Sequence, residues 1–173
     1  MRAGPCSGAR GFHLTGLLLV IAGSALLASW GIPRLLAPRL EQNEESARRH
    51  LEMLDGLQQA WLLRRSWPAS LLELSTRGLP GSAEAAPPAL GEGWLGGLEP
   101  AGRVLRGGYL FRDGWTERQP AGVWAWPATP GYSGRRVYWL DYATHRIHRV
   151  PGREGGGEPP AGPPEVGELQ PLD

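Results

Sequence analysis

The sequence contains no lysine and only one cysteine. All 18 basic residues are arginines, which excludes a Schiff-base lysine, a phosphate-loop lysine and Ser-x-x-Lys catalysis. Cys6 has no second cysteine to pair with, so an internal disulfide is excluded as well. The formal net charge is only +1, and charge therefore gives no case for a nucleic-acid partner.

Glycine and proline are abundant instead. The 173 residues include 26 glycines and 17 prolines, and 41% of the residues are apolar. This composition predicts a small apolar core with much of the chain in loops. The length fits one domain, or one domain with an N-terminal anchor.

The longest uncharged run lies near the N-terminus, from Gly11 to Pro33. It is about as long as the ~20 residues that a helix needs to cross a bilayer. Residues 34–66 then predict an amphipathic helix that continues from this run, because apolar side chains recur at helical spacings. The inward face of that helix is expected to contain Leu40, Ala47, Leu51, Leu54, Gln58 and Trp61.

The second half of the chain has strand signals. Aromatic and aliphatic residues alternate in 108–114, 122–128, 135–142 and 145–150, which predicts three or four antiparallel strands with short links. Before them, Ser70 is expected to cap a short helical turn, and 78–102 is expected to form a loop. The eight tryptophans are interpreted mainly as core residues of this sheet, rather than as a stacking surface for ligands.

The segment "RGFHLTGLLLVIAGSALLASWGIPRLL" resembles the N-terminus of type IV pilins and of the pseudopilins of type II secretion. The resemblance implies a leader peptide that is cut between Gly11 and Phe12, with possible N-methylation of Phe12. Pro33 matches a proline that the family has at this distance from the cut. The implied partners are a prepilin peptidase, other pilin or pseudopilin subunits, and the inner membrane.

One position departs from the family pattern. Gly16 stands where the family has a glutamate, at the fifth mature position. In the family that carboxylate is thought to neutralise the N-terminal amine of a neighbouring subunit, and a buried unpaired charge would be costly. The departure suggests a minor or tip subunit, with a diverged protein that never polymerises as the alternative.

The expected fold class is therefore α+β and pilin-like, with a long helix, first membrane-spanning and then amphipathic, packed on a small antiparallel sheet. The expected parts are a leader (1–11), a transmembrane helix (12–33), an amphipathic continuation (34–66), a periplasmic domain (67–150) and a disordered tail (151–173). The expected location is the bacterial inner membrane, in a single pass, with the C-terminal domain in the periplasm or displayed on a filament.

The sequence predicts no catalytic residues, no cofactor and no metal. His145 and His148 are three residues apart and would point to opposite faces of a strand. Asp113, Glu117 and Asp141 are the nearest calcium candidates, but they are not spaced as a ligand cluster. Two alternatives to a pilin-like subunit stay open. They are a single-pass anchored periplasmic protein that does not polymerise, and a secreted binding domain.

Overall fold

The computed structural model describes residues 14–76, 90, 102–153 and 157–172. The chain divides into two compact units, Met1–Ala37 and Pro38–Asp173. Helix α1 (Leu14–Leu62) contributes its first part to the first unit and the rest to the second. Each unit is described by itself below.

In the second unit, α1 buries one stripe of side chains. Residues three, four or seven positions apart lie on the same side of an α-helix, and this spacing selects the buried set. Its members are Leu40, Glu44, Ala47, Leu51, Leu54, Gln58 and Trp61. The inward face predicted from the sequence is thus confirmed, with Glu44 added to it.

A six-stranded antiparallel sheet forms the body of the second unit, and its strands follow one another in chain order. They are β1 (Val104–Arg106), β2 (Tyr109–Trp115), β3 (Pro120–Pro127), β4 (Tyr138–Asp141), β5 (Arg146–Arg149) and β6 (Gln170–Pro171). The short helix α2 (Leu71–Thr76) precedes the sheet, and a 3-10 turn (Val166–Glu168) precedes β6. Ser70 caps α2 as expected, because its hydroxyl accepts a hydrogen bond from the Glu73 N–H.

The β1–β2 hairpin turns through Gly107 and Gly108, with φ angles of 53° and 78°. Two consecutive positive φ angles are typical of a type I′ turn, which favours glycine at both positions. A Cβ at Gly108 would lie 2.9 Å from the Cβ of Ser133, so the position needs glycine for space as well as for conformation.

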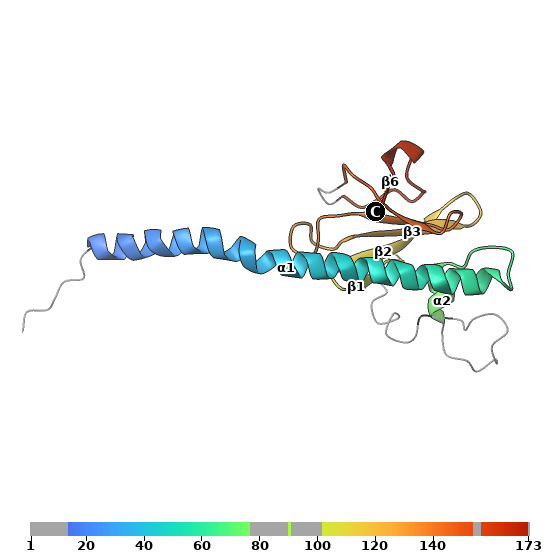
Figure 1. The fold of residues 1–173 in the computed structure, drawn as a ribbon, viewed down its shortest axis with the longest axis horizontal. Helices are drawn as coiled ribbons and strands as arrows, with labels where there is room; N and C mark the ends of the chain where they lie inside the picture. The colour runs from blue at the N-terminus through green and yellow to red at the C-terminus, as the bar shows by residue number, and fades with distance from the viewer. Residues whose placement is uncertain (1–13, 77–89, 91–101, 154–156, 173) are drawn as a thin grey trace, which may run out of the picture. The chain divides into compact units, whose positions relative to one another are not determined.

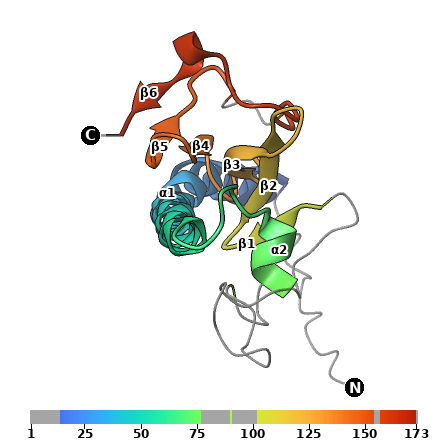
Figure 2. The same cartoon turned by 90° about the vertical axis from the view of Figure 1, so that its right-hand side faces the viewer.

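The sheet lies between two layers (Figures 1 and 2). One face packs against α1 and α2 through Tyr109, Phe111, Val123, Ala125, Tyr138 and Leu140. The other face carries a smaller cluster of Trp124, Trp126, Val137, Trp139 and Val150, with Leu169 against it. Alternate residues along β2, β3 and β4 therefore belong to different clusters, because successive side chains of a β-strand point to opposite faces.

The C-terminal residues from 159 to 169 lie over this second face (Figure 2), where Gly162 bonds to Trp124 and Leu169 packs against the tryptophan cluster. The sequence predicted a disordered tail over 151–173, because its composition is rich in glycine and proline. In the described part of this tail, residues 157–172 are instead ordered through side-chain and backbone hydrogen bonds to the sheet and through β6.

The predicted fold class is wrong. The sheet has six strands rather than three or four, and no described helix is both long enough and apolar enough to cross a bilayer. This finding also contradicts the predicted localisation as a single-pass inner-membrane protein.

Candidate functional site

Two of the four predicted site residues, Gly11 and Phe12, lie outside the described residues, so leader cleavage stays a prediction. The other two, Gly16 and Pro33, both lie in the part of α1 that belongs to the first unit. Gly16 is exposed, and a Cβ built on it would meet nothing within 4 Å. Gly16 and Pro33 lie far apart along this helix and do not come together.

The described side chains of the first unit form an exposed apolar surface, which we call the α1 apolar segment (residues 17–27). Its large members are Leu17, Leu18, Leu19, Val20, Ile21, Leu26 and Leu27, each at least 45% exposed. Five consecutive residues cover more than a full helical turn of 3.6 residues, so apolar side chains project in every direction around the axis. The Ser24 hydroxyl donates a hydrogen bond within the helix, to the Val20 carbonyl at 2.6 Å.

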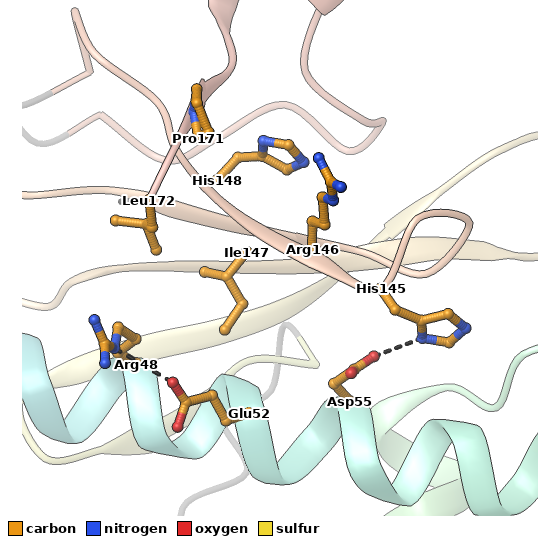
Figure 3. Close-up of a pocket in the computed structure, with 9 residues that line it drawn as sticks. All are labelled: Arg48, Glu52, Asp55, His145, Arg146, Ile147, His148, Pro171 and Leu172. Atoms are coloured by element: carbon orange, nitrogen blue, oxygen red, sulfur yellow. Dashed lines mark hydrogen bonds and ion pairs between the residues drawn. The ribbon is translucent and has the colours of Figure 1, made fainter.

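In the second unit, a cavity of about 530 Å³ opens between α1, β5 and β6 (Figure 3). His145 turns toward the helix, where its Nδ1 lies 2.6 Å from Oδ1 of Asp55. His148 points away from the helix (Figure 3), so the two histidines do not converge, as their spacing predicted. Lining residues are Arg48, Glu52, Asp55, His145, Arg146, Ile147, His148, Pro171 and Leu172.

The turn between β4 and β5 positions His145. Asp141 accepts hydrogen bonds from the Ala143 N–H at 2.9 Å and from the Thr144 hydroxyl at 2.8 Å, which is a local turn motif of aspartate. His145 then has φ 54°, an uncommon value that histidine tolerates better than most residues. The turn therefore directs the imidazole toward the helix instead of along the strand.

The lining of this cavity offers little for catalysis. Its lining contains a histidine–carboxylate pair, but no serine, cysteine, threonine or tyrosine that such a pair could activate. Arg48 is already engaged by Glu52, with an Nε–Oε1 distance of 3.3 Å. The prediction that the chain is not an enzyme stays a prediction.

The three calcium candidates do not form a site. Within the described ranges, no group of three or more histidine, cysteine or acidic residues could hold a metal ion. The Asp141 carboxylate already accepts the two hydrogen bonds of the β4–β5 turn. Asp113 is buried and accepts the Leu71 N–H with both oxygens, at 3.1 and 3.0 Å.

The environment of Asp113 was missed by sequence reasoning. Burial raises the pKa of its carboxyl to about 7, while the hydrogen bond from Leu71 acts in the opposite direction and the nearby Glu73 charge adds to the rise. The alternation of Tyr109, Phe111 and Asp113 along one strand could have shown that this carboxylate faces inward. The partner at Leu71 is 42 residues away, and no local pattern indicates it.

Comparisons of the chain with protein-family models, with curated proteins and with solved structures found no match.

Proposed function

We propose that this chain is a non-enzymatic structural subunit of a pilin-like or pseudopilin-like assembly, of the type II secretion or type IV pilus kind. The observation that carries the proposal is the α1 apolar segment (17–27), whose large side chains are exposed all around the helix. A helix that is apolar on every side is stable in water only when it is buried.

Other copies of the same kind of helix are the partners that suit this segment. Burying one leucine or isoleucine side chain is worth about 1.5–3 kcal/mol, so a cluster of seven large apolar residues provides a strong drive for helix association. The segment has no charged side chain to oppose close packing, and its one hydroxyl-bearing residue, Ser24, is bonded within the helix.

Gly16 supports a minor or tip position within such an assembly. Glycine offers no carboxylate to the N-terminal amine of a neighbouring subunit, whereas the family's glutamate does. A subunit with no neighbour beyond it has no need of that contact. The space around Gly16 in the single chain would accept a side chain, so a Gly16→Glu variant tests assembly without disturbing the subunit itself.

The mature N-terminus of the purified protein tests the proposal. Intact-mass and N-terminal peptide mass spectrometry should find a chain that begins at Phe12, methylated or not. A chain that begins near Ser29 would instead support a secreted binding domain, and a chain that retains Met1 would show that the proposed processing does not occur. Gly16→Glu is the matched variant, and under the tip hypothesis it should change the position of the subunit in the assembly.

A further inference from the structure

The C-terminal segment 157–165 is held to the sheet through its backbone. Four consecutive carbonyls, from Pro159 to Gly162, each accept a hydrogen bond from the sheet. The Arg112 guanidinium donates to the carbonyls of Pro159 and Pro160, the latter at 3.0 Å. The Trp115 backbone N–H donates to the Ala161 carbonyl at 2.7 Å, and the Trp124 indole N–H donates to the Gly162 carbonyl at 2.9 Å.

These donors are available because of how β2 and β3 are built. The β2–β3 register shifts between Gly114 and Trp115, and such an irregularity releases a backbone N–H from the ladder. The Trp124 ring is fully buried against Trp139, with 4.9 Å between the ring centroids. That packing fixes the direction of the indole N–H. Arg112 lies over the Trp126 ring, 5.6 Å from its centroid.

The segment on this face has the chemistry of an extended proline-rich ligand. Prolines occupy 159, 160, 163 and 164, and Glu165 has φ −67° and ψ 145°, values close to those of a polyproline II helix. That conformation has no internal hydrogen bonds, so its carbonyls are free to accept from a partner. Pro159 and Pro164 are buried, and Glu158 pairs with Arg112 and with Arg103.

Recognition on this face therefore has two parts. The first is the pairing of Glu158 with Arg103 and Arg112. The second is a row of hydrogen-bond donors that bind consecutive carbonyls of the segment beside buried proline rings. Aromatic donors and apolar grooves are the usual means by which proteins bind proline-rich peptides. All of these contacts lie within 157–165, and none of them requires the segment to belong to the same molecule.

We propose that the face formed by Arg112, Trp115 and Trp124 is a docking surface for residues 157–165 of a second copy of this chain. A second copy is the occupant that the structure itself supports, because its segment has the sequence already seen to fit. Exchange of an identical segment preserves every contact and is a low-cost route to association. In a single chain the molecule's own segment acts as a competing ligand.

The test is the binding of a fluorescein-labelled peptide with the sequence of residues 157–169 to the full-length protein, measured by fluorescence polarisation. The wild-type protein should bind the peptide weakly, because its own segment occupies the face. The double variant Glu158→Ala/Pro159→Ala weakens the internal segment and should bind the unaltered peptide about tenfold more tightly, since apparent affinity follows the fraction of open surface.

Two further variants make the result specific. Adding Arg112→Ala to the double variant should abolish the gain, because it removes donors from the surface itself. Glu165→Ala changes the charge of the segment by the same amount at an exposed position and should behave like the wild type. Glu158→Gln serves as the milder opening variant if the double variant loses its thermal transition. The proposal is overturned if neither opening variant binds the peptide more tightly than the wild type, or if binding survives Arg112→Ala.

Discussion

The Gln58 side-chain amide pairs with both backbone groups of Ala69. Its Nε2 donates to the Ala69 carbonyl at 2.7 Å, and its Oε1 accepts the Ala69 N–H at 3.0 Å. Both residues are fully buried. This pair satisfies a stretch of irregular backbone where the chain passes from α1 to α2, a region where a missing partner would be costly.

We expect Gln58→Ala to destabilise the second unit strongly. The change leaves a buried N–H and a buried C=O without their partner, at about 1–3 kcal/mol for each unsatisfied group. The free energy of unfolding should therefore fall by about 2–6 kcal/mol, measured by urea denaturation. Gln42→Ala is the matched control at an exposed position of the same helix, and a similar loss there would contradict the account.

Asp113 predicts a pH dependence of stability. Its carboxyl has a pKa of about 7 in the folded protein, raised by burial, against about 3.9 in an unfolded chain. The folded state therefore binds the extra proton between these values. The stabilising contribution of the protonated Asp113 carboxyl to the folded state is fully present below about pH 4, and it is lost as the pH rises toward and through 7.

Asp113→Asn should remove this contribution. As the pH rises from 4 to 8, the wild type should lose about 1–4 kcal/mol of unfolding free energy relative to the variant. His50, whose pKa burial lowers, gives a slope of the opposite sign, but it is present in both proteins and cancels in the difference. A difference that stays constant with pH would show that this carboxyl keeps an ordinary pKa.

The contact between Asp55 and His145 can be measured with a double-mutant cycle. Asp55→Asn and His145→Asn remove the pair, and asparagine tolerates the positive φ angle at position 145. We expect a coupling energy of about 1–2 kcal/mol from thermal or urea unfolding. The same cycle with His148→Asn, whose side chain points away from the helix (Figure 3), should be additive. Equal coupling in both cycles would argue against a specific link.

The regular part of the second unit could be predicted from sequence periodicity. The spacing of Leu40, Leu51, Leu54 and Trp61 identified the buried stripe of α1. The alternation of Trp124 with its neighbours placed it on one face of a strand. These patterns are readable because a regular helix or strand repeats its environment at a fixed interval.

The remaining features depend on contacts between distant residues. Strands β1 and β6 have three and two residues, too few to show a period, and their pairing is set by neighbouring strands. The segment 157–165 has a composition typical of disorder, yet donors on β2 and β3 hold it in place. No local pattern shows that Trp124 and Gly162 meet across 38 residues.

The proposed assembly through the α1 apolar segment is tested most directly by cysteine cross-linking in the native host. Leu19→Cys, at a position 74% exposed, is placed in a Cys6→Ser background, with Tyr132→Cys as the control at an exposed position in the second unit. Mild oxidation should link the Leu19→Cys chain to copies of itself or to partner subunits that carry a cysteine at the matching position, while the Tyr132→Cys chain stays largely unlinked. Equal cross-linking at both positions, or none at Leu19→Cys, would contradict the proposed role of this segment in assembly.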